Sequence, residues 1–177
     1  MVVERALVYE ETTLNVDNEK IIAELFELKK DKTLLADYSN SKNAEQIHPY
    51  FDWGEPKVPD FKEKFGTLDE LKSKVIDVLA NKYRFNNIYM WYNINVPGSY
   101  NRSHHHVDPY NPEPKMSGVY YISAPENSGD LVFTEAKERY EPTAGRLIYF
   151  HPTTWHAVDV NFSDENRISM AFNLYND

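Results

Sequence analysis

The fold is decided by residues 86–95, where hydrophobic and polar side chains alternate with a period of two. This stretch reads Asn86-Asn87-Ile88-Tyr89-Met90-Trp91-Tyr92-Asn93-Ile94-Asn95. The period is typical of a β-strand, because successive side chains of a strand point to opposite faces of its sheet. Both faces carry large side chains and one of them ends in amides, so we expect a strand that is largely buried on both sides.

Short strand-like segments continue from this strand towards the C-terminus, with turn signals between them. They are residues 116–123, 131–133, 146–150, 156–160 and 167–174. The segment Val96-Pro97-Gly98 is expected to end the first strand, because proline lacks the N–H that a sheet requires. Several short strands at regular spacing indicate a β-sandwich or a β-barrel.

Helical patterns occupy much of the chain upstream of these strands. Asp17 is expected to cap a helix with apolar residues from Ile21 to Leu28, and Thr67-Leu68-Asp69-Glu70 has the pattern of a capping box that starts a second helix. Residues 39–59 are polar and irregular, which predicts a long ordered loop.

These patterns together predict one domain over residues 1–177, with an α+β fold that is mainly β. A helical support region, residues 1–85, is expected to pack on a β-rich core, residues 86–177, which carries the functional residues.

Composition excludes several classes of function. The net charge of −9 disfavours binding along a nucleic-acid backbone. Because the chain has no cysteine, disulfides, thiolate metal ligands and a cysteine nucleophile are excluded. No apolar run approaches the roughly 18 residues of a membrane span, and the start of the chain lacks the features of a signal peptide. We therefore expect a cytoplasmic protein that does not bind membranes, and the sequence allows a homodimer.

A candidate metal site is formed by a His-x-Asp pair and a distant histidine. His106 and Asp108 are two residues apart, and His156 follows about fifty residues later, between two predicted strands. Two imidazoles and one carboxylate are the ligands of a non-haem Fe(II) site, in which about three metal positions stay open. We predict His106, Asp108 and His156 as the metal ligands.

The three consecutive histidines leave a second register open. His104 and His106 are also two residues apart, so His104, His106 and His156 would form an all-histidine site with Asp108 left outside. The set with Asp108 is preferred here because the carboxylate completes the facial triad.

A candidate anion site lies on the last predicted strand. Arg167 and Ser169 share its small-residue face with Ala171 and Asn173. A buried guanidinium needs an anion, and its fork matches a carboxylate, to which Ser169 would add a hydroxyl. The alternative is an internal salt bridge between Arg167 and an acidic side chain.

These residues resemble a known family, the 2-oxoglutarate- and Fe(II)-dependent dioxygenases. The resemblance lies in His106-x-Asp108, Gly145-x-Leu147-x-x-Phe150, His156-x-Val158 and Arg167-x-Ser169. Residues 116–121 and 167–173 are similar to a branch of uncharacterised members that is common in phages and marine bacteria, in which some proteins have His-x-His in place of His-x-Asp. The strand with two tyrosines also resembles prolyl hydroxylases.

The resemblance implies a double-stranded β-helix, the cupin-like jelly roll, with Fe(II) held by His106, Asp108 and His156. It further implies 2-oxoglutarate as cosubstrate and O₂ as oxidant. Arg167 would bind the distal carboxylate of 2-oxoglutarate with help from Ser169 and Tyr121. Asn95 and Asn93 would reach the keto-acid end.

The activity that the resemblance implies is hydroxylation of an unactivated C–H bond, with release of succinate and CO₂. The substrate classes are a peptidyl proline, an amino acid or another small metabolite. One alternative is a cupin-like metalloprotein with non-oxidative chemistry, an isomerase or a hydrolase, which would leave the Arg-x-Ser pair unexplained. The other alternative is a binding module without catalysis.

Overall fold

The computed structural model describes residues 8–36, 41–51, 54–110 and 112–176. Its helices are α1 (Asn18–Leu28), the short 3₁₀ helix η1 (Lys32–Leu34), α2 (Phe61–Lys64) and α3 (Gly66–Ala80). Its strands are β1 (Tyr9–Thr13), β2 (Leu35–Ala36), β3 (Ser41–Ile47), β4 (Asn87–His104), β5 (Met116–Ser123), β6 (Leu131–Phe133), β7 (Glu138–Tyr140), β8 (Arg146–Phe150), β9 (His156–Val158) and β10 (Arg167–Tyr175). Every helix in these ranges is too short or too polar to span a bilayer.

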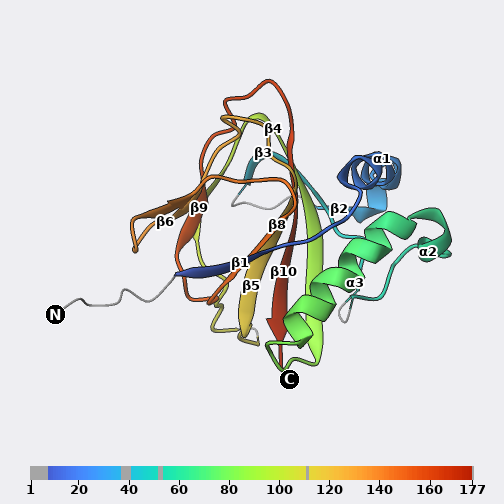
Figure 1. The fold of residues 1–177 in the computed structure, drawn as a ribbon, viewed down its shortest axis with the longest axis horizontal. Coiled ribbons are helices and arrows are strands. Elements are labelled where there is room, and N and C mark those ends of the chain that lie inside the picture. The colour runs from blue at the N-terminus through green and yellow to red at the C-terminus, as the bar shows by residue number, and fades with distance from the viewer. Residues whose placement is uncertain (1–7, 37–40, 52–53, 111, 177) are drawn as a thin grey trace.

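The strands form one curled antiparallel sheet whose two halves face each other. The strand order is β1-β8-β5-β10-β4-β9-β6-β7, and β3 pairs with the free side of β4. The helices lie on one outer side of this sheet, while β6 and β9 lie on the side away from them (Figure 1). The predicted mainly β fold with a jelly-roll core is confirmed. The N-terminal half contributes strands as well as helices, since β1 pairs with β8.

Strand β4 connects the two halves of the sheet. Its first part, from Asn87 to Asn95, pairs with β10, and its last part, from Asn101 to His104, pairs with β9. The prediction that the strand ends at Pro97-Gly98 is therefore wrong. Gly98 takes a positive φ of 83° and donates its backbone N–H to the carbonyl oxygen of Asn161, so the strand bends and changes its partner instead of ending.

The alternation of side chains in β4 separates two hydrophobic clusters. Its residues Ile88, Met90, Tyr92 and Ile94 are buried on the side of α1 and α3, in the larger cluster. A smaller cluster lies between the two halves of the sheet and contains Tyr121, Leu131, Phe133, Tyr140, Ile148 and Phe150. The opposite face of β4 is left for the cavity between the two halves.

Of the two predicted helix caps, that of α1 is confirmed and that of α3 is wrong. Asp17 caps α1 as predicted, because its carboxylate accepts a hydrogen bond from the backbone N–H of Lys20 at 3.0 Å. The predicted capping box of α3 is wrong, since Thr67 lies inside the helix and no side chain of α3 caps it. The carboxylate of Glu24 from α1 accepts the N–H groups of Thr67 and Leu68 at 3.0 and 2.9 Å, so a neighbouring helix supplies the cap.

The loop predicted over residues 39–59 contains strand β3, and this part of the prediction is wrong. Residues 39–40 and 52–53 lie outside the described ranges. Gln46 of β3 and His48 just after it are polar and buried, and both line the cavity, so the segment has the composition of a loop although it pairs with β4.

Replacing the interhelical cap should destabilise the protein. In Glu24→Ala, two N–H groups at the start of α3 lose their acceptor, so the free energy of unfolding should fall by about 1–2 kcal/mol in urea denaturation. Glu27→Ala is the matched control, because Glu27 is exposed on the same helix and pairs with Lys30, three residues away. Equal stabilities of the two variants would contradict the capping role.

Candidate active site

The cavity between the two halves of the sheet has a volume of about 290 Å³. Its floor consists of side chains in register across β3, β4, β10 and β5. Arg167 pairs with Asn95, and Ser169 pairs with Asn93 and, on its other side, with Tyr121. Because every second residue of each strand faces the cavity, the polar residues predicted from the sequence are brought together there.

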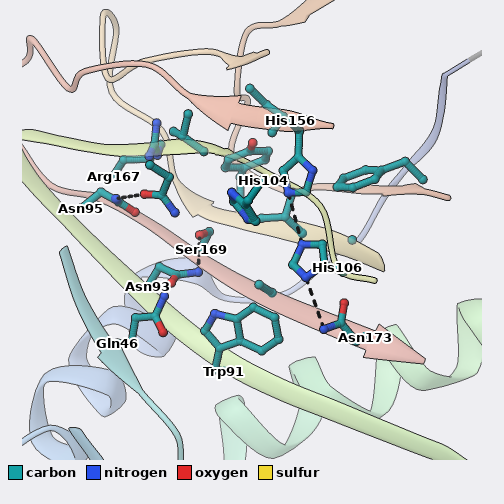
Figure 2. Close-up of a pocket in the computed structure, with 18 of the residues that line it drawn as sticks. Gln46, Trp91, Asn93, Asn95, His104, His106, His156, Arg167, Ser169 and Asn173 are labelled. Atoms are coloured by element: carbon teal, nitrogen blue, oxygen red, sulfur yellow. Dashed lines mark hydrogen bonds between the residues drawn. The ribbon is translucent and has the colours of Figure 1, made fainter. Parts of the chain in front are cut away.

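Three histidines come together at one end of the cavity (Figure 2). Each of His104, His106 and His156 offers one ring nitrogen, and these atoms all lie within 4.8 Å of one another. His104 and His156 are paired in register between β4 and β9, and His106 follows the end of β4. The Nε2 atoms of His106 and His156 are 3.2 Å apart, close to the roughly 3 Å expected between adjacent ligands bound to a metal at about 2.1 Å.

Backbone carbonyls fix the tautomers of two of these rings. Nδ1 of His104 donates to the carbonyl oxygen of Arg102 at 2.7 Å, and Nδ1 of His156 donates to that of Thr154 at 2.8 Å. In a neutral imidazole the other nitrogen then carries a lone pair, so Nε2 of each ring is available to a metal.

Burial keeps these imidazoles uncharged. It lowers the pKa of His106 to about 3 and that of His156 to about 4, with a further contribution from the neighbouring histidines. The pKa of His104 is lowered for the same reason. Protons therefore do not compete for the ring nitrogens near neutral pH, which suits a metal site.

Asp108 is not brought to this cluster. Its side chain is exposed and accepts the backbone N–H of Tyr110 at 2.9 Å. Side chains two residues apart point to the same face only in an extended chain. Because β4 ends at His104, this alternation does not continue to His106 and Asp108. The structure thus groups the residues of the all-histidine register, and the role of Asp108 as a ligand stays a prediction.

Arg167 is buried in the cavity wall, with 2% of its surface exposed. Its Nη1 donates to the carbonyl oxygens of Ser128 and Gly129 at 2.9 and 2.8 Å. No carboxylate of the described residues lies within ion-pair distance of Arg167. The nearby acids Asp130 and Asp159 pair with Arg139 instead. The internal salt bridge considered from the sequence is therefore not formed in the described part of the chain.

Gly129 is required for this anchoring of Arg167. It has a positive φ of 96°, and a Cβ at this position would overlap the carbonyl oxygen of Asp159. Only glycine lets the turn approach so closely and direct two carbonyl oxygens at the guanidinium. The rest of the guanidinium is left with N–H groups for an anion.

The other residues predicted from the sequence also line the cavity. Tyr121 is 4% exposed, and burial raises its pKa to about 12, so its hydroxyl stays protonated and able to donate. The amide of Asn93 donates to the hydroxyl of Ser169 at 3.5 Å, and that of Asn95 donates to Asn101 at 3.5 Å. Their roles towards a cosubstrate remain predictions.

Further cavity residues were missed at the level of the sequence, among them Gln46, His48, Tyr89 and Trp91. The alternation in β4 already places Tyr89 and Trp91 on the face of Asn93, so this signal was present. Gln46 and His48 had no such signal, because their segment was predicted as a loop.

Comparison with known proteins identifies the fold. No protein-family model and no curated protein matches the sequence. Solved structures do match, among them a viral collagen prolyl hydroxylase from Paramecium Bursaria Chlorella virus-1 in a 2-oxoglutarate complex, with a TM-score of 0.64 and 19% identity over 97% of this chain and 98% of that one. The protein has the prolyl hydroxylase fold. A Pseudomonas putida prolyl-4-hydroxylase covers 97% of this chain and 94% of its own, with a TM-score of 0.63 and 16% identity.

A third match is a prolyl hydroxylase from Trichoplax adhaerens in complex with a peptide fragment of a hypoxia-inducible factor. Its TM-score is 0.70 and its identity is 11%, over 96% of this chain and 84% of that one. At these identities the likeness establishes the fold, so the chemistry has to be argued from the residues of the cavity.

Acid should destabilise the metal-free protein through its buried histidines. The folded-state pKa values of His48, His106 and His156 are about 4, 3 and 4, so between pH 6.5 and 4 the unfolded chain binds more protons than the folded one. The free energy of unfolding in urea should therefore fall as the pH falls through this window. His48→Gln should lessen the slope and His151→Gln, an exposed control, should not; a flat profile would contradict the assignment.

Proposed function

We propose that the protein is a 2-oxoglutarate- and Fe(II)-dependent dioxygenase that hydroxylates an unactivated C–H bond. The observation that carries this proposal is the pairing, in one cavity, of three converging imidazoles with a buried arginine that has no carboxylate partner among the described residues. The imidazoles suit a divalent metal, and the arginine suits a dicarboxylate that also reaches the metal.

The residues present fit iron. His104, His106 and His156 would hold it through neutral ring nitrogens, two of which have tautomers already fixed by backbone carbonyls. Three protein ligands leave positions open for a chelating cosubstrate and O₂. With iron bound, the site would supply the oxidative decarboxylation that converts 2-oxoglutarate, O₂ and a C–H bond to succinate, CO₂ and an alcohol.

The protein's own part is to bind and orient 2-oxoglutarate. Arg167 would donate to the distal carboxylate with the N–H groups that are not used by the turn of Ser128 and Gly129. The hydroxyl groups of Tyr121 and Ser169 line the same cavity and would add hydrogen bonds to that carboxylate. A guanidinium held by two carbonyl oxygens has little freedom left to lose on binding, which favours affinity.

For the substrate we propose a peptidyl proline, an amino acid or another small metabolite. The Trichoplax prolyl hydroxylase of the same fold is in complex with a peptide, which supports a peptide among these classes. The non-oxidative alternative also accommodates three histidines, but it gives no role to Arg167.

Two variants distinguish the ligand set that contains His104 from the set that contains Asp108. His104→Ala should lower the iron content well below one Fe(II) per chain after anaerobic loading, because it removes one of the three converging nitrogens. Asp108→Ala should keep the iron content, since its carboxylate lies outside the cluster. The reverse result would establish His106, Asp108 and His156 as the ligands, and circular dichroism of each variant would check folding.

The cosubstrate role of Arg167 is tested by anaerobic absorption spectroscopy. Addition of 2-oxoglutarate to the Fe(II) protein should give the weak visible band of an iron–keto acid chelate, as the family resemblance implies. Arg167→Ala should raise the concentration needed for half saturation at least about tenfold while iron binding is kept, because a charge-assisted contact is lost.

Arg146→Ala is the matched control, since Arg146 lies on β8 and binds Thr13 at the surface. It should leave the titration unchanged. Iron binding with no band in the unaltered protein would overturn the oxygenase proposal and favour a different metalloprotein.

A further inference from the structure

One wall of the cavity is not used by the proposed metal and cosubstrate sites. It is formed by Gln46, His48, Tyr89 and Trp91, from β3, the residues after it and β4. In Figure 2, Gln46 and Trp91 lie along one side of the cavity, and Arg167 and His156 lie along the other. The Trp91 ring is 6.4 Å from that of His106, so this wall adjoins the metal end.

The aromatic part of this wall is a packed cluster. The rings of His48 and Trp91 are stacked, with 6.2 Å between centroids and an interplanar angle of 5°. Tyr89 packs against Trp91 at 5.5 Å. A fixed indole presents a flat apolar surface at low entropic cost, which suits the carbon face of a substrate.

The polar part of the wall is a chain of hydrogen bonds with a defined direction. Nε2 of His48 lies 3.2 Å from Oε1 of Gln46, and because an amide oxygen only accepts, this nitrogen donates. Burial holds the pKa of His48 near 4, so the ring is neutral and Nδ1 accepts from the hydroxyl of Tyr89 at 2.6 Å. The Gln46 oxygen is thereby occupied, while its amide nitrogen has no acceptor among the described residues.

The charges in the cavity restrict what this wall can bind. Of the described residues that line the cavity, Arg167 is the only lysine, arginine, aspartate or glutamate. If Arg167 binds the cosubstrate, a charged group of the substrate would find no counter-ion there, and a buried unpaired charge is costly. A zwitterionic free amino acid is therefore disfavoured as the group that enters.

We propose that Gln46 and Trp91 form the substrate subsite, which takes an uncharged group with a carbonyl acceptor beside an apolar face, such as an amide-blocked residue. The Gln46 amide would donate to the carbonyl, and Tyr89 and His48 are positioning residues that orient this amide. The inference rests on the proposed oxygenase function and selects among its substrate classes.

The test uses the Fe(II) protein with 2-oxoglutarate bound, and pairs of probes with the same side chain. Each pair consists of a free amino acid and its N-acetyl amide, supplied with O₂, and succinate formation is measured. The blocked member of at least one pair should raise the rate, with an apparent KM at least about tenfold below that of the free amino acid, because only the free form carries charges into the cavity.

Variants connect this selectivity to the wall. Gln46→Ala and Tyr89→Phe should each raise the KM for the blocked probe about tenfold with a smaller change in kcat. Each variant removes one hydrogen bond from the chain that runs from Tyr89 through His48 to Gln46 and the carbonyl of the substrate. Glu45→Gln is the control, because Glu45 is the neighbour of Gln46 on the opposite face of β3 and pairs with Lys29. A merely structural role of Tyr89 would lower stability without this shift in KM.

Failure of the subsite and failure of the oxygenase proposal give different results. If the iron–keto acid band does not form, the oxygenase proposal has failed. If the band forms but free and blocked probes act equally, or no blocked probe acts, or the KM is unchanged in Gln46→Ala, the subsite proposal is overturned while the oxygenase proposal stands.

Discussion

The pairing of β10 with β4 is the constraint on which the rest of the structure depends. Nine residue pairs in register, from Arg167–Asn95 to Tyr175–Asn87, hold these strands at the centre of the sheet. Because side chains alternate, one face of this pair is hydrophobic and packs on α1 and α3, and the other is polar and faces the cavity. A slip of one residue would exchange the two faces, so the hydrophobic packing outside also specifies the chemistry inside.

The electrostatics of the cavity follow from this burial. Burial lowers the pKa of His106 to about 3, so the imidazole is neutral near pH 7 and keeps a lone pair for a metal. A guanidinium cannot escape in the same way, so Arg167 stays charged and is held by two carbonyl oxygens. The same physical condition therefore makes one end of the cavity receptive to a cation and the other to an anion.

Much of this could be predicted from the sequence, and the exceptions have physical causes. The period of two in β4 and β10 is a local signal, so the β-rich core and the shared face of Arg167 and Ser169 were predictable from the pattern. The jelly roll and the place of Tyr121 followed from the family resemblance. The cap of α3 was not, because Glu24 reaches it from another helix. The position of Asp108 depended on where β4 ends, and a pattern of alternating residues does not determine the exact end of a strand. Strand β3 was hidden because all of its residues except Ala44 and Ile47 are polar, which is the composition of a loop.

The continuous course of β4 through both halves of the sheet affects how the cavity can deform. Asn95 near the arginine and His104 in the histidine cluster belong to the same strand, so covalent backbone joins the two ends of the cavity. Away from β4, the separation of the two halves depends on loops, on side-chain packing and on hydrogen bonds between strands. Thermal motion of the jelly roll should therefore change the width of the cavity far more than the distance between the arginine and the histidine cluster. A dicarboxylate that bridges these two ends would stay in place while the opposite wall adjusts to different substrates.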